Sequence, residues 1–291
     1  MLVEEIVLQV ENSALRGRVY WPGGEKHLLE AQPMLILCHG IPRAKAGTVA
    51  ESDVETETEA APDTMINANA QRGAEKNPPI KEEEDGGYAA LAAQCVARLG
   101  LPVFHFNFRG TGESEGNFDL LGWTRDLVAF LDYWEGRGAN NGFYLWGFSA
   151  GAAVSSCVAA MESRVRKVIL GACPASFRKI FSRESAKQLI QRFRLTGIIR
   201  QKDFPPDQAK WHEDLFAVEP VEYIGRLAPR PLLLAHGTAD ELIPLDHAYE
   251  LYKNAGRGRN LLILPGALHQ LRREEKAVEL CLDWLKKAHS S

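Results

Sequence analysis

A serine in a Gly-x-Ser-x-Gly setting is the most chemically suggestive feature of this 291-residue chain. The run from Tyr144 to Ala153 reads YLWGFSAGAA, an apolar strand-like stretch that changes into small, helix-compatible residues. Ser149 stands between Gly147 and Gly151, and such glycines allow a sharp strand-to-helix turn that forces the serine backbone to positive φ and exposes its hydroxyl. The pattern predicts a serine nucleophile, with a purely structural turn as the alternative.

A serine nucleophile needs a histidine base, and the histidine needs a carboxylate that fixes its tautomer. Two later segments carry these groups. Residues 231–235 read as a buried strand followed by a loop with Asp240, and residues 260–264 read as a strand followed by a loop with His269. Glu241 is the close rival of Asp240 for the role of the acid. We expect the acid and the base to lie beyond the ends of two strands.

Two earlier loops complete a recognisable set. Residues 35–42 read LILCHGIP, a strand that ends in His-Gly, and residues 103–114 read VFHFNFRGTGES. Together with the order Ser149, Asp240, His269, these motifs resemble those of the α/β-hydrolase superfamily. The resemblance extends over nearly the whole chain apart from one insertion.

This resemblance implies a mostly parallel sheet flanked by helices, with the catalytic loops at the carboxyl ends of the strands. It also implies a serine hydrolase that cleaves a carboxylic ester or thioester through an acyl-enzyme intermediate. The backbone N–H groups of Ile41 and Ala150 would form the oxyanion hole. For Arg109 we expect a structural role, bonding loop carbonyls or a carboxylate beneath the site.

Two other functions remain open. A peptidase or amidase of the same fold would be expected to need a carboxylate in the cap for a substrate amine, and Glu213, Asp214 and Glu222 are available there. A non-catalytic protein on the same scaffold would use the pocket only to bind a ligand.

Two segments interrupt the pattern of one α/β domain. Residues 44–85 contain eleven acidic and four basic residues and no aromatic side chain, a composition that predicts disorder. A lid over the pocket is the alternative for this insertion. Residues 174–227 begin with apolar and basic residues at helical spacing, which predicts a small helical cap, or else a helix packed on the body with a solvated charged face.

Alternating strand and helix signals between these segments predict the elements of the sheet. Strands are expected near residues 6–10, 15–21, 34–38, 102–107, 142–146, 166–171, 231–235 and 260–264. Helices are expected near residues 87–99, 120–135, 150–162, 246–254 and 272–287.

Composition narrows the class of partner. A net charge of −4 argues against nucleic acid, because phosphate binding rests on accumulated lysine and arginine. The first residues lack a signal-peptide pattern and no apolar run approaches ~18 residues, so we expect a cytoplasmic protein without stable membrane insertion. The five scattered cysteines read as buried free thiols. We assign no metal or cofactor, expect a small-molecule acyl substrate, and leave the oligomeric state open.

Overall fold

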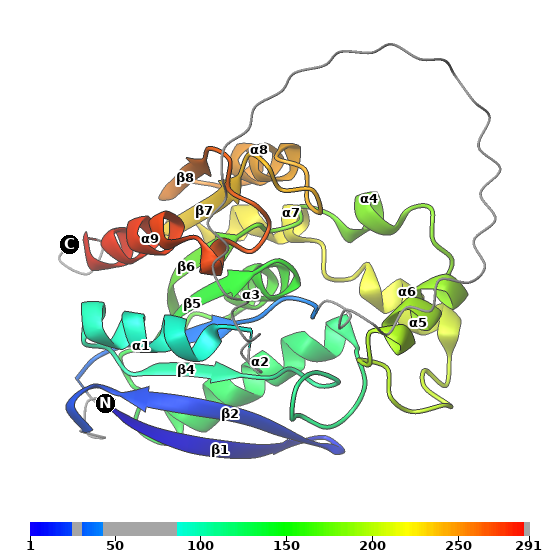
Figure 1. Cartoon of the computed structure of the whole chain (residues 1–291), viewed down its shortest axis with the longest axis horizontal. Coiled ribbons are helices and arrows are strands. Elements are labelled where there is room, and N and C mark those ends of the chain that lie inside the picture. The colour runs from blue at the N-terminus through cyan, green and yellow to red at the C-terminus, as the bar shows by residue number, and fades with distance from the viewer. Residues whose placement is uncertain (25–30, 43–85, 288–291) are drawn as a thin grey trace, which may run out of the picture.

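The computed structural model describes residues 1–24, 31–42 and 86–287, and Figure 1 shows their arrangement. The predicted disordered insertion at residues 44–85 lies outside the described residues. All strands of the described part belong to one eight-stranded sheet in the order β1-β2-β4-β3-β5-β6-β7-β8. They are β1 (Leu2–Val10), β2 (Ser13–Trp21), β3 (Met34–Cys38), β4 (Val103–Phe106), β5 (Phe143–Phe148), β6 (Val165–Gly171), β7 (Leu232–Gly237) and β8 (Arg259–Leu264).

The helices of the described part follow the strands in alternation. The longer ones are α1 (Tyr88–Leu99), α2 (Leu120–Glu135), α3 (Ala150–Met161), α8 (Asp246–Asn254) and α9 (Glu275–Lys287). Between β6 and β7 lie α4 (Phe177–Phe181), α5 (Ala186–Leu195), α6 (Gln208–Leu215), α7 (Pro220–Tyr223) and the 3-10 turn η3 (Ile224–Leu227). Two further 3-10 turns are η1 (Pro22–Gly24) and η4 (Leu271–Arg273).

The sheet is antiparallel at one edge and parallel elsewhere. β1 and β2 form a hairpin, β2 pairs antiparallel with β4, and the remaining neighbours are parallel. The two strands of the hairpin were expected near residues 6–10 and 15–21. They begin earlier, at Leu2 and Ser13, and leave a two-residue turn between them. The expected mostly parallel α/β sheet is confirmed.

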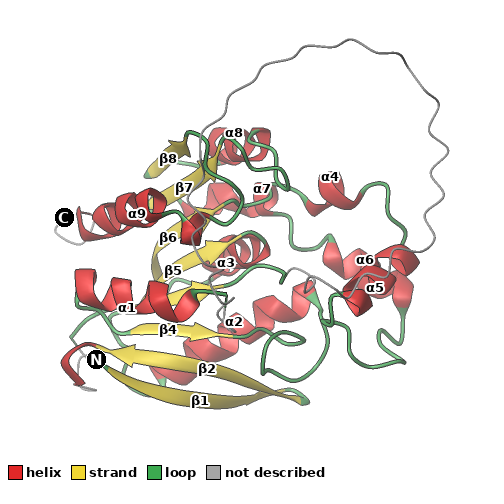
Figure 2. Ribbon diagram, in the orientation of Figure 1, coloured by secondary structure: helices red, strands yellow, loops and turns green. Residues whose placement is uncertain are grey.

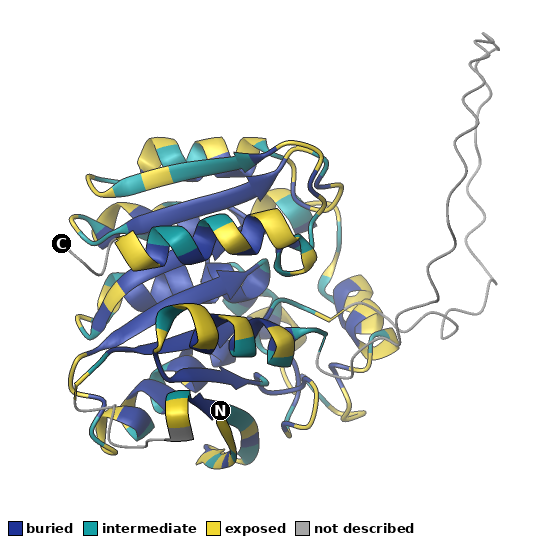
Figure 3. Cartoon of the chain, turned by 60° about the vertical axis from the view of Figure 1, so that its left-hand side comes forward, coloured by how far each residue is buried: buried dark blue, intermediate teal, exposed yellow. Residues whose placement is uncertain are grey.

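Apolar residues on both faces of the central strands explain why helices cover both sides (Figure 2). In β3, Met34 and Ile36 belong to the core under α2, α3 and α8, whereas Leu35 and Leu37 belong to the core under α1 and α9. Such continuous apolar runs are typical of parallel strands buried on both faces. Figure 3 shows the strands as mostly buried and the outer helix faces as exposed.

The short helices between β6 and β7 form the predicted small helical cap. In Figure 1, α4, α5 and α6 lie beyond the carboxyl ends of the parallel strands. Most of the apolar residues that predicted these helices are buried, among them Phe177, Phe181, Leu189 and Phe193. Leu195, the last residue of α5, is an exception among these apolar residues, because it is 56% exposed.

Candidate active site

Ser149 occupies the turn between β5 and α3 with a strained backbone. Its φ of 54° and ψ of −124° are rare for a residue with a side chain. Its N–H donates to the carbonyl of Gly171 at 2.8 Å, which ties the turn to the end of β6. Gly151 is required nearby, since a Cβ there would collide with the carbonyl oxygen of His39. Strain of this kind is concentrated at functional sites, where the surrounding structure maintains it.

His39 fixes the loop that follows β3. Its Nδ1 donates to the carbonyl of Gly40 at 2.7 Å, and its Nε2 accepts from the N–H of Phe108 at 3.1 Å. Burial lowers the pKa of His39 to about 4, against the opposing effect of its bond to Gly40. The ring is therefore neutral at neutral pH, as this pair of hydrogen bonds requires.

The loop after β3 touches the nucleophile turn directly. A Cβ at Gly40 would lie 2.8 Å from Cβ of Ser149. Within the described residues, the N–H groups of Ile41 and Ala150 donate to no protein acceptor. Stabilisation of an oxyanion requires backbone donors that have no such acceptor within the part of the chain that the structure describes.

Backbone hydrogen bonds join the loop after β7 to the loop after β8. Thr238 N–H donates to Leu264 O at 3.0 Å, and Ala239 N–H donates to Ala267 O at 3.1 Å. Gly266 N–H in turn donates to the hydroxyl oxygen of Thr238 at 2.8 Å. The two loops are therefore tied together, and they carry the predicted acid and the predicted base.

Asp240 and His269 meet across these loops. Nδ1 of His269 lies 2.8 Å from Oδ2 of Asp240, whose side chain is fully buried. The other oxygen, Oδ1, accepts from the N–H groups of Leu242 at 3.0 Å and Ile243 at 2.9 Å. Burial alone would raise the pKa of Asp240, but these hydrogen bonds outweigh it, so the pKa lies below its ordinary value. The carboxylate stays ionised and orients the imidazole.

A second histidine also approaches the acid. His236 is 1% exposed, and its Nε2 lies 2.9 Å from Ile243 O and 3.4 Å from Oδ2 of Asp240. Burial lowers its pKa, so it packs against the acid as a neutral ring. Nothing in the sequence signals this contact, because it depends on how the loop after β7 folds back.

The structure joins Asp240 and His269 by a hydrogen bond. In the described chain no hydrogen bond joins Oγ of Ser149 to Nε2 of His269. Catalytic hydrogen bonds are often long before substrate binds and tighten in the complex.

Arg109 has the structural role predicted for it. Its Nη2 and Nε bond the fully buried carboxylate of Asp126 at 2.6 and 3.0 Å, and its Nη1 lies 2.7 Å from Glu11. Burial alone would lower the pKa of Arg109, but the two carboxylates raise it above its ordinary value. The pair anchors the start of the loop after β4, which supports the cap.

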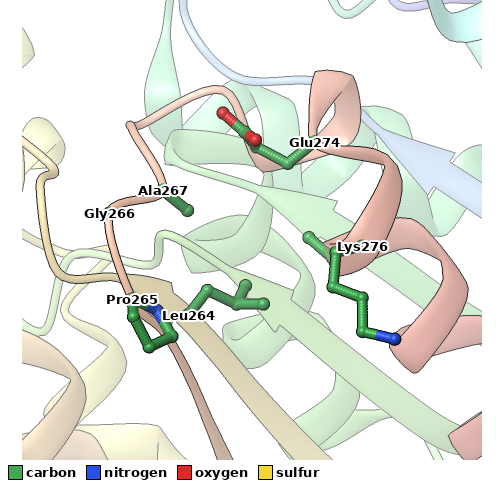
Figure 4. Close-up of a pocket in the computed structure, with 7 residues that line it drawn as sticks. Leu264, Pro265, Gly266, Ala267, Glu274 and Lys276 are labelled. Atoms are coloured by element: carbon green, nitrogen blue, oxygen red, sulfur yellow. The ribbon is translucent and has the colours of Figure 1, made fainter.

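A hollow of about 220 Å³ lies behind the loop after β8 (Figure 4). It is lined by residues 264–267 on the loop side and by Glu274, Lys276 and Ala277 on the other side. Ser149 and His269 are not part of its lining.

The described residues contain no group of three or more His, Cys, Asp or Glu side chains suited to holding a metal ion. No helix in that part of the chain combines the length and the apolar character needed to cross a bilayer. The five cysteines are buried free thiols, as predicted.

Residues 88–291 match the model of the prolyl oligopeptidase family. The chain belongs to this family. Its match includes Ser149, Asp240 and His269 and begins after Ile41. Membership of the prolyl oligopeptidase family confirms the resemblance to the α/β-hydrolase superfamily.

Individual relatives of this prolyl oligopeptidase family member are distant. The uncharacterized protein YfhR of Escherichia coli (strain K12) is 30% identical over 171 residues, which cover 57% of this chain and 52% of that protein. The lysophosphatidylserine lipase ABHD12 of Xenopus tropicalis is 24% identical over 190 residues, covering 60% and 45% of the two chains. The chain thus spans about half the length of the curated relatives it matches.

Among solved structures, ferulic-acid-bound Est1E from Butyrivibrio proteoclasticus superimposes with a TM-score of 0.65 at 16% identity. The superposition covers 98% of this chain and 97% of that one. At this identity the likeness shows the fold alone.

Proposed function

We propose that the protein is a serine hydrolase that cleaves carboxylic esters or thioesters through an acyl-enzyme intermediate. Ser149 is the nucleophile, His269 the general base, and Asp240 the acid that orients it. The observations that carry the proposal are the 2.8 Å contact between Nδ1 of His269 and Asp240, and a serine in a strained turn at the carboxyl end of β5 in the same parallel sheet.

The chemistry follows from these positions. His269 Nε2 removes the Ser149 proton as Oγ attacks the acyl carbonyl carbon, and the N–H groups of Ile41 and Ala150 hold the oxyanion. The imidazolium then protonates the leaving alcohol or thiol, whose bond to the acyl carbon breaks. Water, deprotonated by the same ring, releases the acid and restores the serine.

Names of related proteins favour ester bonds over amides. The similar proteins include the ferulic-acid-bound Est1E and a lysophosphatidylserine lipase. Ester hydrolysis also needs no carboxylate in the cap. We therefore place an ester of a small-molecule alcohol first among candidate substrates.

Labelling with a fluorophosphonate probe, followed by mass spectrometry, tests the proposal. We expect one adduct on Ser149 and no adduct in S149A. Protein that has not been treated with the probe should hydrolyse p-nitrophenyl esters. An untouched serine in folded protein would overturn the proposal and favour the ligand-binding alternative. A series of esters with increasing acyl length then measures the size of the acyl site.

The family name gives the peptidase alternative a specific footing. Of the cap carboxylates available for a substrate amine, Asp214 is paired with Lys210 at 2.9 Å, and Glu213 and Glu222 are exposed. Glu219, by contrast, is 2% exposed and accepts from the N–H of Arg178 at 2.9 Å. A panel of peptide anilides beside the esters separates the two functions, and faster turnover of anilides would favour the peptidase.

A further inference from the structure

One aromatic ring contacts three parts of the candidate active site. Tyr88, the first residue of α1, is 4% exposed. Its ring meets the edge of Phe148, the residue before the nucleophile, with centroids 5.8 Å apart, and the edge of His39 at 6.3 Å. Its other ring partner is His105 in β4, stacked at 4.5 Å. The nucleophile turn and the oxyanion loop therefore share one packing partner.

The loop that carries the base reaches the same ring through Arg272. This arginine stands three residues after His269 in η4, a turn in which Leu271 N–H donates to His269 O at 3.0 Å. The guanidinium carbon lies 5.0 Å from the centre of the Tyr88 ring, and Nε donates to Gly86 O at 2.8 Å. A cation over an aromatic face is attractive, and the hydrogen bond fixes its direction.

The loop packs into the core through Ala267 and Leu271, but other parts of it are loosely packed, which makes the Arg272 contact important. Pro265, Gly266 and Leu268 are exposed. The hollow of about 220 Å³ separates the loop from the beginning of α9, so the loop lacks close packing there (Figure 4). Hydrogen bonds to the loop after β7 also hold it, through Thr238, Ala239 and Asp240.

We propose that Arg272 and Tyr88 form a positioning pair that sets the His269 loop against the nucleophile turn. The pair touches no reacting atom. It acts by fixing how far Nε2 of His269 lies from Oγ of Ser149, two atoms that no hydrogen bond joins in the described chain. This inference rests on the proposed function, in which that proton transfer is the first step.

Displacement of a catalytic group by about 1 Å can cost about 100-fold in rate. We therefore expect R272Q to lower kcat and the rate of fluorophosphonate labelling by about 10- to 100-fold, with KM changed less than about twofold. R272K, which keeps the charge, should recover part of the loss. R273Q is the matched control, because Arg273 is the exposed neighbour in the same turn.

Variants of Tyr88, the partner of Arg272, give a second and independent comparison of activities. Y88F keeps the ring and should retain more activity than Y88L. Because both residues act through one contact, R272Q combined with Y88L should be no slower than the slower single variant. Fully multiplicative losses, or an R272Q variant as active as R273Q, would overturn the proposal.

Hydrogen exchange of residues 265–274 tests the pair without relying on activity. R272Q should speed exchange in this segment, whereas R273Q should leave it unchanged. Failure of the probe to label wild-type protein would contradict the proposed function. The exchange experiment would still show whether Arg272 and Tyr88 hold the loop. Equal exchange in R272Q and R273Q would contradict the pair even if Ser149 is labelled.

Discussion

Oδ2 of Asp240 accepts from Nδ1 of His269 at 2.8 Å, and this bond leaves Nε2 as the only ring nitrogen available as a base. In D240N the amide cannot hold the same tautomer, while an amide oxygen can still accept from Leu242 and Ile243 N–H. We expect kcat to fall by about 10³- to 10⁴-fold with little change in the melting temperature. Steady-state kinetics on the best p-nitrophenyl ester measures the loss.

E241Q is the control for D240N, because Glu241 is the exposed neighbouring acid. It should keep wild-type kcat. If E241Q were the damaging change and D240N the harmless one, the assignment of the acid would be wrong.

Stability should decrease as the pH falls from about 6.5 towards 4. Burial lowers the pKa of His39 to about 4 and also lowers those of His105, His236 and His247. The unfolded chain protonates these rings near 6.5, before the folded protein does, so their neutral state stabilises the fold fully only above that pH. For His39 alone the loss is about 3 kcal/mol.

Urea unfolding at pH 7.5, 6.5, 5.5 and 4.5 measures this decrease in the free energy of unfolding. At pH 5.5 unfolding should take up protons, which calorimetry detects from the dependence of the heat on the buffer. A flat free energy between pH 7.5 and 5.5 would show that the buried rings are charged in the folded protein.

Local sequence signals were enough to predict those candidate site residues that follow directly after the end of a strand. The Gly-x-Ser-x-Gly turn placed Ser149, and the apolar runs before Asp240 and His269 placed both at the same edge of the sheet, because parallel strands bring their carboxyl ends together. In the structure Nδ1 of His269 lies 2.8 Å from Oδ2 of Asp240, and the catalytic roles of both residues stay predictions. The role of Ser149 as the nucleophile stays a prediction until it is labelled.

Contacts between distant segments could not be predicted in this way. Arg272 bonds Gly86 across 186 positions of the chain, and no local pattern marks either residue. Glu219 reads as one more acid in a charged cap, yet it is buried because Arg178 N–H meets its carboxylate. The predicted start of the final helix near residue 272 was also too early, since η4 and a break at Glu274 come before α9.

The buried pair of Arg109 and Asp126 should be costly to break but not to replace. D126A leaves the guanidinium largely buried with only Glu11 as a carboxylate partner, so we expect a loss of about 3 to 5 kcal/mol in the free energy of unfolding. The double variant R109M/D126L removes both charges and should lose much less. Denaturant titration compares them, and a double variant as unstable as D126A would contradict this explanation.

Asn117 anchors the cap to the loop after β4. Its Oδ1 accepts from the N–H groups of Arg200 at 2.8 Å and Gln201 at 2.9 Å, and the Arg200 side chain bonds Ser114 O at 2.7 Å and Gly112 O at 2.8 Å. N117A leaves two N–H groups without their acceptor, at about 1 to 3 kcal/mol each where they are buried. We expect this cost to appear as local opening of the cap.

Limited digestion with trypsin detects that opening, because Arg200 and Lys202 lie in the anchored segment. N117A should be cut there faster than wild type, and its preference among esters of different acyl length should weaken because the cap no longer closes the acyl site in one position. N254A is the control, since the Asn254 side chain makes an exposed hydrogen bond to Glu250 O at the end of α8. Equal cleavage of N117A and N254A would show that the cap is held by its apolar contacts, such as Phe118 against Phe193, and not by this anchor.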